Sequence, residues 1–474
     1  TFIVALVNYG WKFKSLCQVC FMGLFGTSGL RGVVNADLTP SLAVRVGMAL
    51  GTFIGTGKVF VARDSRVSGL MLEDALVSGL VACGIDAYCF GVLPTPVLAY
   101  LTVKLGANAG LMVTASHNPP QYNGIKIFDM DGMAYDEERQ GKLEKIIESG
   151  YFRLADWRNL GRVEYGDESQ LYVDMVLKSI KLGKKWRIVV DPGCGAPSHI
   201  APKIFQKLGC EVKAINSQPD GFFPCRSPEP NAESLKPLSK IVKGLSADLG
   251  VAYDGDGDRA AFIDERGVFV DFDRVLAAYA AHILKRSGGG TVVTNVEASM
   301  CLEKMVESLG GKVVRTRVGD VYVAEAVKKF GAVFGGEPCG AWIHPKHHYC
   351  PDGILSSVLL LRALEDEGKS LSEFVADVPS YPIVRKNIHC RNEVKHLAVK
   401  RAEDLLKRAF PDYKQISAVD GVRLSLTDGW VLVRASGTEP LIRLTVEGES
   451  LKTAEAIMDR ALAAVKRALE DLEK

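Results

Sequence analysis

The chain has 474 residues, of which 47% are hydrophobic and 24% are charged. This length predicts several domains, each large enough to enclose its own core. The formal net charge of +2 provides no bulk electrostatic attraction to nucleic acid or to an anionic membrane, so we expect neither as a partner.

The eleven cysteines are scattered along the chain. Only Cys17 and Cys20 have the spacing of a metal or redox pair, and no second pair completes a zinc site. We expect most cysteines to be small buried hydrophobic side chains in a reducing cytoplasm. Stabilising disulfides are the alternative if the chain comes from a hyperthermophile.

The N-terminal stretch 1–21 holds a short apolar run that Asn8 and Gly10 interrupt. The run is too short to span a bilayer, and no basic segment precedes it. We expect the functional start at Met22, with residues 1–21 as an extension outside the fold.

Three stretches share one pattern: an apolar strand-like run, a polar or glycine-rich turn, a helical segment, a terminating glycine and a second strand-like run. The terminating glycines are Gly84, Gly209 and Gly310, where a left-handed residue commonly ends a helix. Strands that alternate with helices predict parallel α/β units. We therefore predict an α/β protein with three related α/β domains.

The last 95 or so residues follow a different pattern. Short strand-like runs lead to a final helix from about Thr453, which predicts a smaller α+β domain. Pro379 and Pro382 mark the linker before it. The predicted domains are 22–165, 166–268, 269–380 and 381–474.

A polar cluster interrupts the apolar pattern in VTASHNPPQYNGIKIF, residues 113–128. It places Ser116 beside His117, followed by two prolines and Lys126. Because neighbours in an extended chain point to opposite faces, we do not expect Ser116 and His117 to form a nucleophile–base pair.

The segment DLGVAYDGDGDRAAFIDERG holds Asp254, Asp256 and Asp258 with glycines between them. The glycines let the backbone fold tightly, so three carboxylates can converge on one cation, and carboxylates alone favour a hard ion such as Mg²⁺. An EF-hand fits only in part, because Arg259 replaces the required glycine and both flanks look like strands. A surface turn of solvated aspartates is the alternative.

The segment VRASGTEPLIRLTVE near the C-terminus combines two arginines, two hydroxyls and a glycine-freed backbone. These groups suit a dianionic phosphate. They are Arg434, Ser436, Gly437, Thr438 and Arg443. A tight turn between two strands with an incidental arginine is the alternative.

Three further loops are weaker candidates. GGEPCGAWIHP presents Glu337, which could accept hydrogen bonds from sugar hydroxyls, although a structural turn explains the segment nearly as well. GTSGLRG holds Ser28 and Arg31, and RVGDVYV holds Gly319 and Asp320.

Together, these segments resemble the α-D-phosphohexomutase family, which includes phosphomannomutase/phosphoglucomutase and phosphoglucosamine mutase. The matching motifs run in order from about Met22 to the C-terminus: FGTSGLRG, TASHNP, NGIK, PDGFFP, PEPNAE, DGDGDR, VGDVYV, GEPCG and RASGTEP. The resemblance implies three related α/β domains with mixed sheets and a smaller C-terminal α+β domain, arranged around a central cleft.

The same resemblance implies a cytoplasmic isomerase that interconverts hexose 6-phosphate and hexose 1-phosphate. The phosphoryl group would pass through a phosphoserine and a hexose 1,6-bisphosphate intermediate. The implied substrates are glucosamine phosphate or mannose and glucose phosphates, and the implied state is a monomer or homodimer.

The resemblance also assigns roles to individual residues. Phosphorylated Ser116, Asp254, Asp256 and Asp258 would hold one Mg²⁺ per chain. The implied catalytic residues are Ser116, His117, Lys126, Arg31 and Arg259. Glu337, Cys339, Gly319 and Asp320 would bind the sugar. Arg434, Ser436, Gly437, Thr438 and Arg443 would hold the phosphate that is not transferred.

Two positions depart from the family pattern and leave the preferred sugar open. Cys339 stands where the sugar loop usually has serine, and a thiol is a weaker hydrogen-bonding group than a hydroxyl. Val321 stands where many bacterial relatives have arginine.

Two other functions compete with the mutase. A Mg²⁺-dependent phosphatase of the haloacid dehalogenase type would phosphorylate Asp254 or Asp256, but Asp258 stands where that class has Thr or Val. A non-catalytic sugar-phosphate-binding protein would have no need of Ser116 and Lys126 beside the three aspartates.

Overall fold

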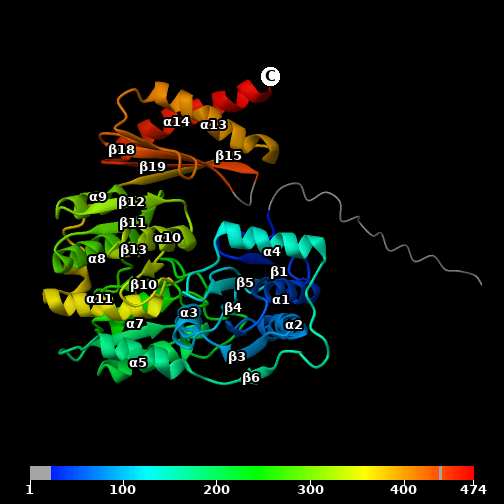
Figure 1. Cartoon of the computed structure of the whole chain (residues 1–474). Coiled ribbons are helices and arrows are strands. Elements are labelled where there is room, and N and C mark those ends of the chain that lie inside the picture. Colours follow the sequence, from blue (N-terminus) through cyan, green and yellow to red (C-terminus); the bar gives the residue numbers. More distant parts are fainter. Residues whose placement is uncertain (1–22, 437–439, 474) are drawn as a thin grey trace, which may run out of the picture.

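The computed structural model describes residues 23–436 and 440–473, which form four sheets with helices packed against them (Figure 1). The first three sheets belong to α/β units and the fourth to an α+β unit, which confirms the predicted fold class. The expected N-terminal extension, with Cys17 and Cys20, lies outside the described residues. Among the described helices, none has both the length and the apolar character of a membrane span.

The first sheet has six strands in the order β1-β5-β4-β2-β3-β6. It is mixed, because β1 and β5 pair antiparallel and the central strands pair parallel. The strands are β1 (Leu30–Val33), β2 (Lys58–Arg63), β3 (Asp86–Val92), β4 (Ala109–Val113), β5 (Tyr122–Asp129) and β6 (Val163–Tyr165). The helices are α1 (Pro40–Ile54), α2 (Gly69–Ala82), α3 (Thr95–Lys104) and α4 (Glu137–Ser149).

The second sheet has the order β10-β9-β7-β8, and its β9–β10 pair is an antiparallel hairpin. Its strands are β7 (Arg187–Asp191), β8 (Glu211–Ala214), β9 (Leu249–Tyr253) and β10 (Ala260–Ile263). The accompanying helices are α5 (Ser169–Ser179), the 3₁₀ turn η1 (Ala196–Ser198), α6 (Ile200–Lys207) and α7 (Lys236–Gly244).

The third sheet has the order β12-β11-β13-β14. Its strands are β11 (Thr291–Asn295), β12 (Lys312–Thr316), β13 (Phe334–Gly336) and β14 (Trp342–Ile343). The helices of this unit are α8 (Phe272–Ser287), α9 (Met300–Glu307), α10 (Asp320–Phe330), α11 (Gly353–Glu367) and α12 (Leu371–Phe374).

The predicted repeat appears once in each of these sheets, as β2-α2-β3, β7-α6-β8 and β11-α9-β12. In each case the two strands pair parallel. Gly84, Gly209 and Gly310 all have positive φ, which only glycine adopts readily, so each ends its helix as expected.

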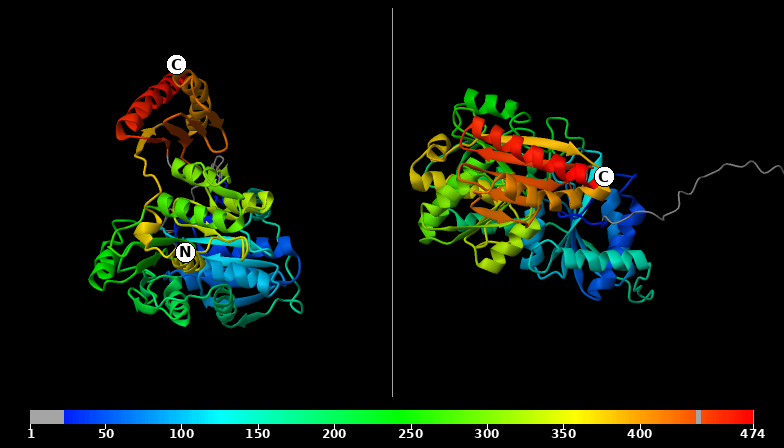
Figure 2. Two further views of the ribbon diagram at one scale, coloured as in Figure 1. Left: turned by 90° about the vertical axis from the view of Figure 1, so that its left-hand side faces the viewer. Right: turned by 90° about the horizontal axis from the view of Figure 1, so that it is seen from above.

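The fourth sheet is antiparallel throughout, with the order β15-β19-β18-β17-β16. Its strands are β15 (Ile383–His389), β16 (Gln415–Ser417), β17 (Val422–Ser425), β18 (Gly429–Ala435) and β19 (Leu441–Gly448), and its helices are α13 (Asn392–Ala409) and α14 (Leu451–Glu473). Helix α13 was not among the expected elements. Figure 2 shows this unit, orange to red, at one end of the molecule.

The hydrophobic cores divide the chain into two parts. One continuous core joins the first three units, with members such as Phe60, Tyr253 and Phe334. The fourth unit has a separate core, and a small cluster of Val296, Trp430 and Leu432 joins it to the third. The last unit is therefore attached through a much smaller apolar contact than the others.

Candidate active site

A cavity of about 390 Å³ is lined by residues from all four units. It brings together predicted site residues that are distant in sequence: Arg31, His117, Lys126, Asp258, Arg259, Gly319, Asp320, Glu337, Cys339, Arg434 and Arg443. Three others, Ser116, Asp254 and Asp256, are fully buried and contact one another or the wall residue Lys126. Ser436 is buried but does not line the cavity, and Gly437 and Thr438 lie outside the described residues.

The loop between β4 and β5 carries Ser116 in a left-handed conformation, with φ of 51°. A non-glycine residue adopts this conformation only when its surroundings hold it there. The Ser116 amide donates to Thr114 Oγ1 at 2.8 Å, and that hydroxyl donates to Asp64 Oδ2 at 2.7 Å. The Ser116 hydroxyl in turn donates to Asp254 Oδ2 at 2.6 Å.

The left-handed turn also changes the relation between Ser116 and His117. Their side chains were expected to point to opposite faces, but Ser116 Oγ lies 3.4 Å from His117 Nδ1. That expectation was wrong, because it assumed an extended backbone. The Ser116 hydroxyl nevertheless donates its hydrogen bond to Asp254 Oδ2, which is the shorter contact. Ser116 and His117 therefore do not form a hydrolytic pair.

Arg66, which was not predicted as a site residue, binds the backbone of this loop through hydrogen bonds. Its fully buried guanidinium pairs with Asp64 at 3.0 Å. It also donates at 2.6 to 2.9 Å to four loop carbonyls, those of Ser116, Asn118, Pro119 and Tyr122. The planar fork of arginine makes this possible, since its donors diverge in fixed directions.

The second α/β unit also contacts Arg66, on the side away from the serine loop. The Phe223 ring lies over the guanidinium, with 5.1 Å between its centroid and Cζ. Gly255, in the turn 254–258 that carries the three aspartates, also touches the serine loop, because a Cβ there would lie 2.5 Å from the Ser116 carbonyl oxygen. The conformation of the serine loop is therefore set jointly by the first and second units.

The three aspartates lie in the turn of the β9–β10 hairpin, and three of their carboxylate oxygens lie within 4.8 Å of one another. Residues of the first unit contact them. Thr95 Oγ1 donates to Asp256 Oδ2 at 2.5 Å, and Lys126 Nζ donates to Asp258 Oδ2 at 2.6 Å. The EF-hand alternative is wrong, since strands flank the turn on both sides.

Burial and neighbouring charges shift the pKa values of this cluster in different directions. Burial, together with Asp258 and Asp256, raises the pKa of Asp254 well above its usual value. Burial opposes ionisation of Asp256 too, but Lys126 and the Thr95 hydrogen bond outweigh it and lower the pKa of Asp256. Burial likewise opposes the charge on Lys126, yet the carboxylates of Asp256 and Asp258 raise its pKa, so Lys126 is held protonated.

The donor set fits a hard divalent cation. Asp256 Oδ1 and Asp258 Oδ1 are buried without a hydrogen-bond partner among the described residues. Three buried carboxylates lie beside two cationic side chains, Lys126 and Arg259, and an excess of buried negative charge is costly unless a further cation compensates it. Oxygen ligands without thiol or imidazole favour Mg²⁺ over softer metals.

Glu337 occupies the cavity wall with its carboxylate partly engaged. Its Oε1 accepts from Asn295 Nδ2 at 2.7 Å and from the Gly319 amide at 2.9 Å. Burial and the nearby Asp320 raise the pKa of Glu337. The loop that carries Glu337 is joined to the start of β10, directly after the three aspartates, through the Ala260 amide, which donates to the Gly340 carbonyl at 3.1 Å.

The remaining wall residues bring charges of both signs to the cavity. Burial raises the pKa of Cys339 to about 12, so this group is a neutral thiol. Burial also raises the pKa of Asp320, whose Oδ1 has no hydrogen-bond partner among the described residues. Arg31 donates to Asn118 Oδ1 at 2.9 Å, and Arg259 lies 3.8 Å from Asp258 Oδ1.

The fourth unit contributes two arginines that face each other across adjacent strands. Arg434 on β18 and Arg443 on β19 are directly paired in the sheet register. Arg434 forms ion pairs with Asp420 at 3.0 Å and with Glu297 of the third unit at 3.1 Å. Two neighbouring guanidinium groups offer several divergent N–H donors, which suit a phosphate dianion.

Several residues that line or support the cavity were not predicted from the sequence. Arg66 and Thr95 support the two loops from buried positions, whereas Glu229, Asn295 and Glu297 line the wall. A usable signal existed for Arg66, since the charged run Arg-Asp-Ser-Arg follows the apolar strand β2. Nothing local marks Thr95 or Asn295, because their partners are distant in sequence.

Comparison with known proteins identifies the family. Profiles described as phosphoglucomutase/phosphomannomutase match the chain in order: alpha/beta/alpha domain I over 22–154, domain II over 170–267, domain III over 271–381 and the C-terminal domain over 386–464. The chain belongs to the phosphoglucomutase/phosphomannomutase family. This confirms the resemblance to α-D-phosphohexomutases, and the protein is an isomerase of the phosphomutase type.

Two archaeal relatives carry the name "Probable phosphoglucosamine mutase". The protein of Pyrococcus horikoshii is 46% identical over 448 residues, covering 94% of this chain and 99% of the relative. That of Methanopyrus kandleri is 47% identical over 451 residues, with the same coverage. The phosphatase and non-catalytic alternatives find no support among these matches.

Solved structures show the same fold. A phosphoglucomutase/phosphomannomutase family protein from Burkholderia thailandensis superposes with a TM-score of 0.84 at 29% identity, covering 94% of this chain and 98% of that one. N-acetylphosphoglucosamine mutase from Aspergillus fumigatus shares the fold with a TM-score of 0.60 at 17% identity, covering 94% and 96%.

Arg66→Lys is expected to lower kcat by about 10- to 100-fold, because a lysine cannot hold four carbonyls in a fixed fork and the serine loop would shift. Arg66 lies under the loop without lining the cavity, so KM should change by less than about threefold. Steady-state kinetics of the folded protein measure this split. Arg63→Lys, at a nearby half-buried ion pair with Glu73, is the control and should retain normal kcat. An unchanged kcat in Arg66→Lys would refute the positioning role.

Proposed function

We propose that this phosphohexomutase interconverts glucosamine 6-phosphate and glucosamine 1-phosphate through phosphorylated Ser116. The observation that carries the proposal is the Ser116 hydroxyl, which meets a buried aspartate triad beside a cavity with arginines on another wall. The full-length archaeal relatives named for phosphoglucosamine support the substrate.

The charge of the cavity also favours an amino sugar. Glucosamine phosphates carry an ammonium group, which needs a carboxylate partner once it leaves water. Asp320 Oδ1 is buried on the cavity wall without a hydrogen-bond partner among the described residues. We infer that Asp320 accepts the sugar ammonium, and that Glu337 accepts from the sugar hydroxyls.

We assign separate roles in the phosphoryl transfer to Ser116, to the three aspartates and to Lys126. Ser116 gives its phosphoryl group to the free hydroxyl of the sugar phosphate, which forms a 1,6-bisphosphate, and then takes back the other phosphate. Asp254, Asp256 and Asp258 would hold Mg²⁺, which neutralises phosphoryl charge when bound. Lys126, held protonated, adds positive charge at the reacting end of the cavity.

His117 would receive the proton of the attacking sugar hydroxyl. Burial, with Arg259 and Arg31 nearby, lowers the pKa of His117 to about 2, so its imidazole is neutral and can accept a hydrogen bond. When the substrate phosphate pairs with Arg259 and Arg31, it would neutralise their positive charge. His117 would then become a stronger base.

The bisphosphate must turn around before the second transfer, so one phosphate site has to accept either end of the sugar. We assign this site to Arg434 and Arg443, with Ser436, Gly437 and Thr438 completing the loop. Arg434 now pairs with Glu297 of the third unit, and a phosphate dianion would compete for it. The separate core of the fourth unit lets this exchange open and close the cavity.

Ser116→Ala should lower turnover by at least about 1,000-fold, because it removes the hydroxyl that meets Asp254 and is proposed to carry the phosphoryl group. It should also abolish transfer of radioactive phosphate from glucose 1,6-bisphosphate to the protein. Ser78→Ala, an exposed serine on α2, is the control and should behave as wild type. Residual turnover near the wild-type rate would rule out the phosphoserine route.

The substrate is tested by comparing kcat/KM for glucosamine 1-phosphate, glucose 1-phosphate and mannose 1-phosphate on one preparation. We expect a preference of at least about tenfold for glucosamine 1-phosphate, since a buried carboxylate left unpaired penalises neutral sugars. Asp320→Asn should lower kcat/KM for glucosamine 1-phosphate by a larger factor than it lowers kcat/KM for glucose 1-phosphate. Equal or better use of the neutral sugars would overturn the substrate and leave the mutase assignment intact.

A further inference from the structure

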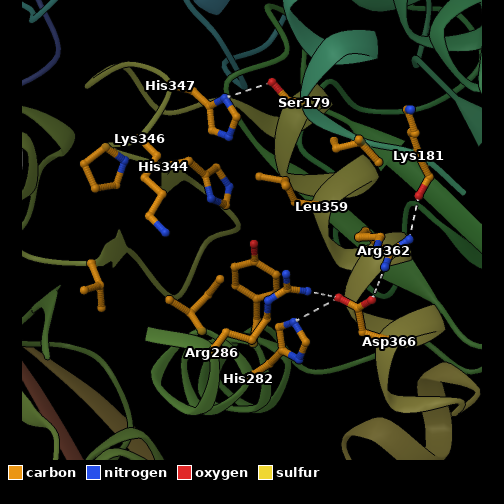
Figure 3. Close-up of a pocket in the computed structure, with 15 residues that line it drawn as sticks. Ser179, Lys181, His282, Arg286, His344, Lys346, His347, Leu359, Arg362 and Asp366 are labelled. Carbon is orange, nitrogen blue, oxygen red and sulfur yellow. Dashed lines mark hydrogen bonds and ion pairs between the residues drawn. The ribbon is translucent and has the colours of Figure 1, made fainter. Parts of the chain in front are cut away.

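A second cavity, of about 460 Å³, lies away from the active site and shares none of its residues (Figure 3). It opens between α8, α11, the end of α5 and the segment 344–347 that follows β14. Its volume is within the range of small-molecule sites in proteins. The mutase mechanism uses none of its wall.

The cavity wall carries a surplus of positive charge. Lys181, Arg286, Lys346 and Arg362 line it, with Asp366 as the only carboxylate among the lining residues. Asp366 is already paired with both arginines, so it offers no countercharge to the lysines. Within the described residues, neither lysine ammonium forms an ion pair, in a chain whose net charge is only +2.

Neutral polar groups complete this wall. Tyr279, which is 1% exposed, lines the cavity. Burial lowers the pKa values of His344 and His347, so both rings offer hydrogen bonds without charge. Figure 3 shows Lys346 and His347 on one side of the opening and Arg286, Arg362 and Asp366 across from them.

We propose that this cavity binds a small molecule that carries a phosphate group. The Lys346 ammonium and the Tyr279 hydroxyl match the charge and acceptor oxygens of a phosphate, and Lys181 adds positive charge on the opposite side of the opening. Ile180, Ile283, Val333 and Leu359 give the wall an apolar part, which suits a phosphorylated compound with a nonpolar body.

Equilibrium dialysis with radioactive inorganic phosphate tests the site on the full chain. The active site also binds phosphate, so the informative quantity is the difference between proteins. We expect Lys181→Ala/Lys346→Ala to bind one phosphate fewer per chain than wild type. Lys178→Ala/Lys240→Ala removes two exposed lysines outside the cavity and should bind as much as wild type. Equal binding by wild type and the cavity variant, or equal losses in both variants, would overturn the proposal.

Two cysteines of the second unit lie close together. Cys194 Sγ lies 3.4 Å from Cys225 Sγ, and both are free thiols. Cys194 follows β7 and is buried, whereas Cys225 is exposed. Thiols this close need only a small movement to reach the length of a disulfide.

Their backbones are held in place on both sides. The Cys194 amide donates to the Asn216 carbonyl at 2.7 Å, and its carbonyl accepts from the Asp220 amide at 2.9 Å. Beside Cys225, the buried Arg226 pairs with Asp191 at 3.1 Å and donates to the Tyr253 carbonyl at 2.6 Å. The proximity of the thiols is therefore set by the fold of this unit.

We infer that Cys194 and Cys225 form a disulfide when a disulfide-type oxidant is present. The exposed Cys225 thiolate attacks the oxidant and releases one thiol, and Cys194 then displaces the second thiol as the new S–S bond forms. The two protein thiols lose two protons and two electrons, and the oxidant gains them. The bond would fix the segment that carries Phe223, which lies over Arg66.

Peptide mapping without reductant tests the cross-link after treatment with oxidised glutathione. We expect one peptide pair that joins Cys194 to Cys225, and a thermal midpoint raised by about 5 °C relative to the reduced protein. Cys225→Ser should abolish both effects, whereas Cys390→Ser, in the fourth unit, should preserve them. Recovery of both cysteines as free thiols, or of either in a different pair, would overturn the inference.

Discussion

The structure depends on a cluster of buried charge between the first and second units. Asp254, Asp256 and Asp258 converge in one hairpin turn, where their mutual repulsion would be prohibitive without compensation. The compensation comes from the first unit, through the Lys126 ammonium, the Thr95 hydroxyl and the Ser116 hydroxyl. The same contacts that compensate the three carboxylates therefore also place the Ser116 hydroxyl, which is proposed to react.

The conformation of the serine loop depends on contacts from both the first and the second unit. Arg66 gathers its carbonyls, Phe223 covers Arg66 from the second unit, and Gly255 leaves room for the Ser116 carbonyl. The left-handed conformation of Ser116 is held by contacts from both sides. A rigid platform results, as phosphoryl transfer requires of the groups that align the reacting atoms.

The fourth unit differs physically from this platform. Its core is its own, and its apolar contact with the third unit is the small cluster around Trp430. Its polar contacts include Arg434 with Glu297, and the Met300 amide with Glu447 at 2.8 Å. Polar contacts of this kind exchange with solvent or ligand more readily than a packed core. The fold thus joins the proposed transfer site, which is held rigidly, to a fourth unit that is less firmly attached and carries the proposed phosphate site.

The sequence by itself determined the features that depend on local chemistry. Period, glycine stops and strand-like runs predicted the three parallel units, and the alternation of aspartate with glycine predicted a carboxylate cluster in a tight turn. Local pattern failed at helix α13, and it gave the wrong geometry for Ser116 and His117, because a left-handed residue is not visible in residue order. Only the tertiary structure decided which charges meet: Lys126 with Asp258, Arg66 with the serine loop, and Arg434 with Glu297. These pairs join units far apart in sequence, and their energies depend on burial, which exists only once the chain has folded.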